Sequence, residues 1–411
     1  MSVNNAGVAS HLHPIASYEV GDHPLPARRS EIWRFSPLNE LRPLTEDGHP
    51  YDGLGWRGEL PAGVTMTELS RDEAIARGVG QPVDRIAALA LARGRGARLD
   101  IPAGAVLEHP VVLDAEGARA PSQIAYGHTL ITIGAQNAEG GRPPSPPAQV
   151  TYGHTLITVG AHARAIIVLR YGGLAVLGEL LNVEIGEGAE VTIVSLQNWD
   201  EGAVHAGQHS FLIGRNATVK TVTATLGGDA VRLMETTSFD GPGGSIDQFG
   251  LYFADTGQHL EHRLFVDHNA PHTTSRVDYR GALQGAGAWT AWVGDVLIRK
   301  VAEDIDTYES NKNLMLTDGC RADSVPNLEI ETGQIRGAGH SSTTGRFDDE
   351  QLFYLRSRGI PEDEARRLVV HGFFAEIIRR IGVADVEAAL LAAVERELAV
   401  TAADHPTSQE Q

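Results

Sequence analysis

Cysteine and lysine are scarce in this chain of 411 residues. Its single cysteine, Cys320, excludes an internal disulfide framework and could hold a metal only with help from other side chains. None of the three lysines, Lys220, Lys300 and Lys312, stands in the GxxxxGK[ST] pattern of a phosphate-binding loop. If ATP serves the protein's work, we therefore expect another chain to bind it.

Long apolar runs and excess positive charge are also missing. No stretch of 18 apolar residues occurs, and the N-terminus lacks the basic start and apolar run of a signal peptide. The formal net charge of −19 at pH 7 disfavours nucleic acid and anionic membranes as partners. These features predict a cytoplasmic protein, and a hydrophobic content of 42% is ample for a core.

Composition and periodicity divide the chain into four regions. Residues 1–83 mix proline, glycine and charge with short helix signals, which predicts a mostly helical N-terminal region. Residues 84–345 form the predicted core, where short runs of Val, Ile, Leu and Thr alternate with glycine-containing turns. Residues 346–400 return to helical periodicity, and residues 401–411 are expected to form a flexible tail.

A repeat runs through the predicted core. Apolar residues followed by turn chemistry recur at steps of 26, 26, 28, 26 and 26 residues, at Ile133, Val159, Ile185, Ile213, Phe239 and Phe265. Short strands and turns repeated at such a period are typical of a solenoid, whose stacked coils share one apolar column. We therefore predict a mainly β fold with a β-helix core; an ordinary β-sandwich is the alternative.

YGHTLITIGA (126–135) and YGHTLITVGA (152–161) indicate a local duplication within this region.

Three helices are predicted after the strands, at residues 347–358, 361–381 and 383–399. The first has a partly apolar face formed by Leu352, Phe353 and Leu355. Apolar residues of the second fall at spacings of three and four: Ala365, Leu368, Val369, Phe373, Ile377 and Ile381. Such faces pack against a core or a partner.

Two side chains are candidate metal ligands. His340 lies among small polar residues that leave its imidazole accessible to a ligand or a partner, and a water-satisfied surface histidine is the alternative. Cys320 follows a turn, and its thiolate would be a soft metal ligand, although a single thiol more often has no such role. We interpret the densest histidine run as structural or solvent-exposed because its spacing matches no closed zinc pattern: His259, His262, His268 and His272.

The sequence contains no catalytic signature of the GxSxG or HExxH kind. Acidic residues are numerous enough to place a carboxylate pair in the groove of a β-helix, so a cytoplasmic carbohydrate-active enzyme is the alternative function. An aromatic content of only 6% and the lack of a secretion signal count against that alternative.

Several segments resemble the SufB/SufD family of iron–sulfur cluster assembly proteins. The similarity is most specific in DEQLFYLRSRGIPEDEARRLVVHGFFAEII (349–378), and it extends to DHNAPHTTSRVDYRGAL, NKNLML, VPNLEI and RRSEIWRFSPL. It covers about residues 28–381. RRSEIWRF and HNAPHTTSR favour the SufD branch of the family over the SufB branch.

The resemblance implies a right-handed parallel β-helix with helical terminal domains, acting as a non-catalytic scaffold for cluster assembly and iron acquisition. It implies two partners, a SufB-like paralogue along the late strands and a SufC-like ABC-type ATPase on the C-terminal helices. A homodimer is expected when the chain is isolated. The residues expected to contact the ATPase are Leu352, Phe353, Leu355, Ile360, Pro361, Leu368 and Phe373.

The resemblance also implies a transient iron–sulfur cluster or iron site shared with the SufB-like partner, with no cofactor held tightly by this chain alone. His340 matches the family histidine near that interface. Relatives commonly carry a cysteine two residues earlier, where this chain has Ala338, so that thiol is missing here. Cys320 lies near the cysteine-bearing strand region of the family and is the second candidate ligand.

Overall fold

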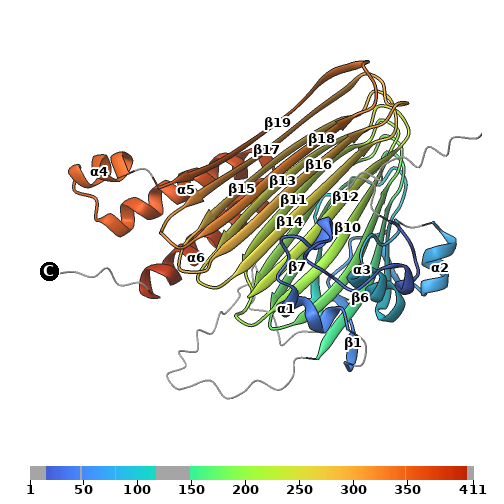
Figure 1. The fold of residues 1–411 in the computed structure, drawn as a ribbon. Helices are drawn as coiled ribbons and strands as arrows, with labels where there is room; N and C mark the ends of the chain where they lie inside the picture. The colour runs from blue at the N-terminus through green and yellow to red at the C-terminus, as the bar shows by residue number, and fades with distance from the viewer. Residues whose placement is uncertain (1–14, 47–48, 79, 117–148, 348, 405–411) are drawn as a thin grey trace, which may run out of the picture.

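Two large β-sheets form the body of the protein (Figure 1). The computed structural model describes residues 15–46, 49–78, 80–116, 149–347 and 349–404. Sheet A contains β1 (Tyr51–Gly53), β3 (Thr65–Glu68), β4 (Arg95–Ile101), β6 (Val150–Val159), β8 (Val176–Ile185), β10 (Val204–Gly214), β12 (Ala230–Asp240), β14 (His259–His268), β16 (Trp289–Ile298) and β18 (Arg321–Ile330). Sheet B contains β2 (Gly55–Arg57), β5 (Val111–Glu116), β7 (Arg164–Gly173), β9 (Glu190–Trp199), β11 (Thr218–Gly227), β13 (Ser245–Ala254), β15 (Thr274–Leu283), β17 (Ile305–Met315) and β19 (Ile335–Arg346).

From β4 onward the chain crosses from one sheet to the other after each strand, so the sheets are the two walls of a solenoid. Neighbours are parallel from β4 to β18 in sheet A and from β5 to β19 in sheet B. Seven strand pairs, from β6/β7 to β18/β19, stack as successive coils. The predicted mainly β solenoid is therefore confirmed.

The sequence repeat follows one column of buried side chains in sheet A. Val159 pairs with Ile185, Ile185 with Ile213, and Ile213 with Phe239. The glycine after each of the first three residues turns the chain out of the sheet. A Cβ at Gly186 would lie 2.6 Å from the backbone nitrogen of Ala161 in the preceding coil. Parallel in-register stacking thus explains why apolar residues and turn glycines recur together.

The repeat does not keep its period of 26 residues beyond Phe239. Phe265, the predicted next member, is half-buried, and the position stacked on Phe239 is instead His268, with ring centroids 5.2 Å apart. The steps become 29, 30 and 32 residues, because the successive positions are His268, Ile298 and Ile330. Ile133 and the first copy of the duplication lie outside the described residues.

The N-terminal region mixes short helices with short strands, which differs from the mostly helical region predicted. Its strands join the solenoid: β1 pairs with β6, and β2 and β3 pair antiparallel with β5 and β4. Pro37 separates two short helical turns, at residues 31–33 and 38–41. The helices are η1 (Val20–Asp22), η2 (Glu31–Trp33), α1 (Leu38–Leu41), η3 (Arg42–Leu44), α2 (Arg71–Ala76) and α3 (Arg85–Arg93).

Arg232 on β12 fixes the N-terminal region to the outer face of sheet A. Its buried guanidinium donates to Asp84 Oδ2 at 2.7 Å and to Ser36 Oγ at 3.2 Å. It also lies 4.1 Å from the ring centroid of Trp33. Asp84 in turn caps α3 by accepting a hydrogen bond from the backbone of Ala87. One buried ion pair therefore joins a helix cap, a loop and a strand.

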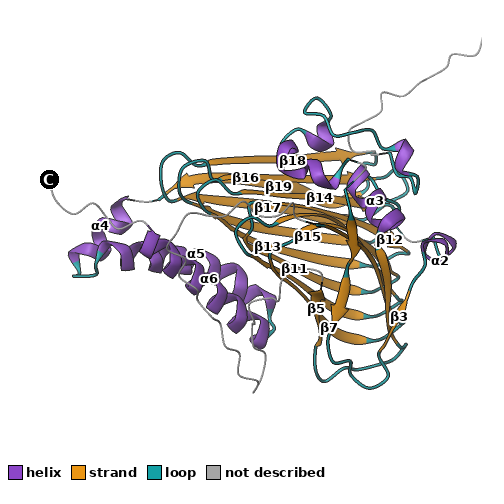
Figure 2. Cartoon of the chain, turned by 90° about the horizontal axis from the view of Figure 1, so that it is seen from below, coloured by secondary structure: helices purple, strands orange, loops and turns teal. Residues whose placement is uncertain are grey.

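Three helices close the chain: α4 (Asp349–Ser357), α5 (Glu362–Ile381) and α6 (Ala384–Asp404). Figure 2 shows α5 and α6 lying along sheet B. Phe374, Ile377 and Ile381 pack with Phe249 and other outward apolar residues of that sheet. The last helix reaches Asp404, so the predicted tail begins later than residue 401. Within the described part of the chain, no helix is long and apolar enough to cross a membrane.

Replacing Arg232 with methionine tests the attachment of the N-terminal region. The change leaves the Asp84 carboxylate buried without its cation, so we expect the free energy of unfolding to fall by about 3–5 kcal/mol. Urea unfolding followed by circular dichroism measures the loss. Arg215→Met, at an exposed arginine, is the control and should change stability by less than about 0.5 kcal/mol. A loss below about 1 kcal/mol at Arg232 would contradict this account.

Candidate functional site

The last coil of the solenoid has no coil above it. β18 pairs only with β16, and β19 pairs only with β17, so both strands form sheet edges. Their side chains are half-buried or exposed throughout, whereas the strands of earlier coils are mostly buried. This end of the solenoid therefore presents side chains and backbone groups that earlier coils cover.

His340, the first predicted ligand, lies in the middle of β19 at this open end. Its Cα partner on the coil below is Glu309 of β17. Ala338, two residues earlier and on the same side of the strand, packs against the apolar core of the solenoid. His340 thus belongs to the inward-facing set of β19, and it is exposed because no further coil covers it.

Glu309 is buried, with only 1% of its surface exposed, and neither carboxylate oxygen has a hydrogen-bond partner. Its side chain reaches across the interior toward sheet A: a Cβ at Gly294 on β16 would lie 2.8 Å from Glu309 Oε1. Burial, and next the negative charge of Asp295, raise the pKa of Glu309 well above its usual value of 4.5. This carboxyl group is the most poorly satisfied acid beneath the last coil.

The other inward polar residues of β17 contrast with Glu309. Thr307 shares a hydrogen bond of 2.6 Å with Ser275. Asn311 donates to the Tyr252 hydroxyl at 2.9 Å, and its own carbonyl oxygen accepts from Asn313 at 2.8 Å. The fold therefore satisfies polar groups on both sides of Glu309 along the same strand and leaves this one carboxyl unpaired.

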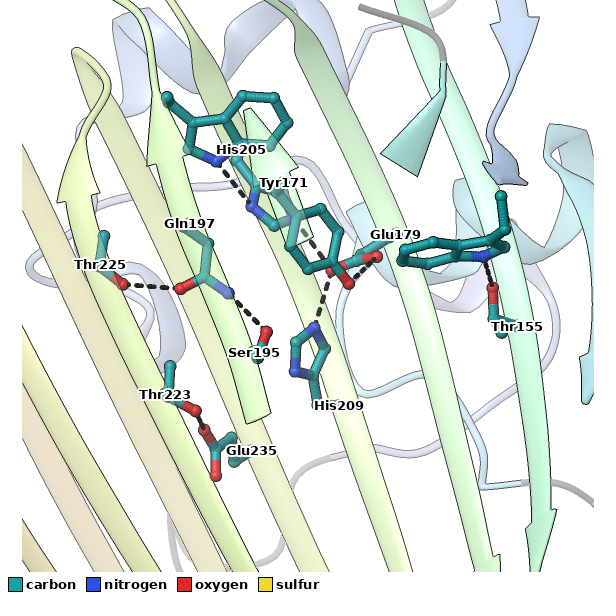
Figure 3. Close-up of polar contacts among 12 residues, drawn as sticks. Thr155, Tyr171, Glu179, Ser195, Gln197, His205, His209, Thr223, Thr225 and Glu235 are labelled. Atoms are coloured by element: carbon teal, nitrogen blue, oxygen red, sulfur yellow. Dashed lines mark hydrogen bonds and ion pairs between the residues drawn. The ribbon is translucent and has the colours of Figure 1, made fainter. Parts of the chain in front are cut away.

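Buried acids in earlier coils are also satisfied, as Figure 3 shows. Glu179 forms three hydrogen bonds, with Tyr171 at 3.1 Å, His205 at 3.0 Å and His209 at 2.7 Å. Although burial alone would raise it, the bonds to the two histidines hold the pKa of Glu179 below its usual value. Glu235 accepts from Thr223, Gln248 and Tyr279. A buried acid without partners is therefore not a general feature of this interior.

Cys320, the second predicted ligand, does not lie with His340. Its half-buried thiol donates to the Gly285 carbonyl at 3.4 Å in the turn before β18. That turn lies beside the far end of β19, where Arg346 is 3.1 Å from Asp318. With a strand rise of about 3.3 Å per residue, the thiol is on the order of 15–20 Å from His340.

The histidine run on β14 and the turn after it is structural or solvent-exposed, as interpreted from the sequence. His259 and His262 are buried against Trp289 and Tyr252, and burial lowers their pKa values to about 4 and about 3. His268 is equally buried, and His272 is exposed beside Asp304. Within the described ranges, no group of three or more His, Cys, Asp and Glu side chains could hold a metal ion.

The residues expected to contact an ATPase divide into exposed and packed sets. Phe353 on α4 is 74% exposed, Leu368 on α5 is 45% exposed, and Pro361 between these helices is also exposed. Leu355 and Ile360 pack partly against a small cluster around Phe347 and Ala365, and Phe373 packs partly against the sheet B cluster. The position of the Leu352 side chain lies outside the described residues.

Comparison with known proteins bears on this geometry. Residues 142–373 match the family described as "SUF system FeS cluster assembly, SufBD core domain". An iron–sulfur cluster assembly SufBD family protein of Mycobacterium tuberculosis is 43% identical over 402 residues, covering 96% of this chain and 94% of that protein. The chain belongs to the SufBD family. Membership argues against the carbohydrate-active enzyme considered as an alternative.

More distant relatives carry the name SufD. SufD of Escherichia coli is 26% identical over 200 residues, which is 49% of this chain and 47% of that protein. SufD of Bacillus subtilis is 25% identical over 225 residues, which is 54% of this chain and 51% of that protein. Both matches span about half of this SufBD protein.

Sequence reasoning missed Glu309. Its signal was present in DTYESNKNLM, where a charged residue alternates with Thr307, Asn311 and Asn313 on one side of a strand. Deciding whether that side faces inward requires the register of the coils, since a slip by one residue reverses every side chain.

Replacing Glu309 with glutamine tests the environment of this carboxyl. Because the folded protein raises the pKa of Glu309, the unfolded chain loses this proton first as pH increases above about 4.5. The contribution of Glu309 to stability therefore falls with rising pH, whereas glutamine does not titrate. We expect Glu309→Gln to gain stability relative to wild type between pH 5 and 8, by up to about 1.4 kcal/mol per pH unit.

Thermal and urea unfolding at several pH values measure this difference. Glu331→Gln, at an exposed acid near the same end of the solenoid, is the matched control and should show no such trend. A stability difference between Glu309→Gln and wild type that does not change with pH would show that Glu309 titrates normally.

Proposed function

We propose that this SufBD protein is the SufD-type scaffold subunit of a Suf iron–sulfur cluster assembly complex. In this proposal it performs no catalysis, pairs with a SufB-type subunit and docks a SufC-type ABC ATPase. The matches to two proteins named SufD support the subunit type. The lack of a phosphate-binding lysine pattern fits a chain whose ATPase is a separate protein.

The open edge of β19 is the observation that carries the proposal. At the N-terminal end of the solenoid, the outermost strands β2 and β3 have only three and four residues. At the C-terminal end, β18 and β19 have ten and twelve residues with one side unpaired. Proteins shorten or block the edge strands that must not pair, so a long open edge favours strand addition.

The composition of β19 supports the same conclusion. Residues 337–345 read GAGHSSTTG, without lysine, proline or acidic residues that would oppose pairing. A SufB-type paralogue with the same kind of solenoid could continue both sheets across this edge. When the chain is isolated, a second copy could do the same, which gives the expected homodimer.

Exposed apolar residues near the C-terminus support docking of the ATPase on α4 and α5. Phe353, Tyr354 and Leu368 are 74%, 56% and 45% exposed, although most large apolar residues of α5 are buried on sheet B. Large exposed apolar side chains that lie near one another are typical of interaction sites. The ATPase would therefore contact Phe353, Pro361 and Leu368, with Leu355, Ile360 and Phe373 supporting them from beneath.

His340 connects the open edge to metal chemistry. An exposed imidazole in the centre of an unpaired strand would lie within the seam once a partner adds to it. Iron or a nascent cluster would be held there transiently as cargo, with further ligands from the SufB-type subunit, since this chain offers no complete ligand set among its described residues. Cys320, in the turn before β18, lies on the order of 15–20 Å from His340, which is too far to join the same site.

Replacing His340 with alanine tests this function. The full chain is co-expressed with its SufB-type and SufC-type partners, and cluster assembly is followed anaerobically by absorbance. We expect the complex to form normally while the rate of cluster assembly falls roughly tenfold or more, because one ligand is lost.

His272→Ala is the matched control, since His272 is exposed but lies on a different turn of the solenoid. It should assemble clusters at the wild-type rate. Normal assembly by His340→Ala would exclude the histidine from the site. A stable cluster at full stoichiometry on the isolated wild-type chain would overturn the shared site.

A further inference from the structure

Two side chains of different chemistry occupy paired positions on the last two strands of sheet B, at the open end of the solenoid. His340 and Glu309 are Cα partners on adjacent parallel strands, and neighbouring strands lie about 4.8 Å apart. In-register side chains of parallel strands leave the sheet on the same side, so His340 and Glu309 both belong to the inward-facing set of sheet B, one coil apart. One is exposed and the other is buried beneath it.

The buried carboxyl group of Glu309 could accept a ligand, because no other group of the described chain pairs with it. Both oxygens of Glu309 lack hydrogen-bond partners, although the inward polar neighbours Thr307 and Asn311 are satisfied. Glycine at position 294 leaves space for the carboxyl where a Cβ would approach Oε1 to 2.8 Å. Leaving a buried carboxyl unpaired is costly, and such features concentrate at functional sites.

We propose that Glu309 and His340 form this chain's half of a site for a divalent transition-metal ion, with ferrous iron as the cargo. The proposal deepens the proposed function by adding an oxygen ligand beneath the histidine. Mixed imidazole and carboxylate ligands suit ferrous iron, and two protein ligands leave positions for groups of a partner.

Metal binding by the isolated full chain tests the proposal. Co²⁺ serves as the probe, and its affinity is measured by equilibrium dialysis and by its visible spectrum. We expect one Co²⁺ per chain, with affinity reduced about tenfold or more in Glu309→Gln and in His340→Ala. The matched controls Glu331→Gln and His272→Ala should bind as wild type does.

Each outcome separates this inference from the proposed function. Wild-type affinity in Glu309→Gln, or no Co²⁺ binding by the wild-type chain, overturns the Glu309–His340 site but leaves the role of His340 in cluster assembly intact. Co²⁺ binding that needs both residues, together with normal cluster assembly by His340→Ala, supports the metal site and excludes His340 from cluster assembly.

Thermal unfolding first establishes that the variants fold. Should Glu309→Gln not fold, Glu309→Asp provides the same comparison, because it keeps the carboxyl and withdraws its oxygens by one methylene. Co²⁺ affinity should then fall several-fold, and unchanged affinity would again contradict the proposal.

Discussion

No coil of a β-solenoid can bury its inward side chains alone, and the rest of this structure follows from that constraint. Each strand depends on the coil below and the coil above for both hydrogen bonds and apolar cover. At the N-terminal end, short antiparallel strands take the place of a further coil. At the C-terminal end β18 and β19 lack such cover, so the proposed partner and metal sites lie where stacking stops.

The same constraint explains how far the sequence could predict the fold. The recurring apolar residues and turn glycines predicted the stacked coils, because the in-register pairing of the strands places equivalent residues of successive coils above one another. The repeat could not be followed into the later coils, because their turns lengthen and His268 replaces an apolar residue above Phe239. The N-terminal region was harder to predict, because its short strands β1 to β3 depend on pairing with distant strands rather than on local periodicity.

The residues of the candidate site also differ in how far the sequence could predict them. His340 could be found from its small polar surroundings and from family resemblance, because both are local features of the sequence. Glu309 could not, because its burial and its lack of partners depend on a register between strands about 30 residues apart. Cys320 attracted attention as a soft ligand, yet the turn that holds it lies at the far end of β19.

The central claim is that the open edge of the last coil receives a partner strand. Hydrogen–deuterium exchange of the full chain, alone and with its SufB-type partner, tests this most directly. We expect addition of the partner to slow the exchange of amides in β18 and β19 while leaving β2 and β3 unchanged. Slower exchange confined to β2 and β3, or unchanged exchange in β19 within a formed complex, would contradict the account.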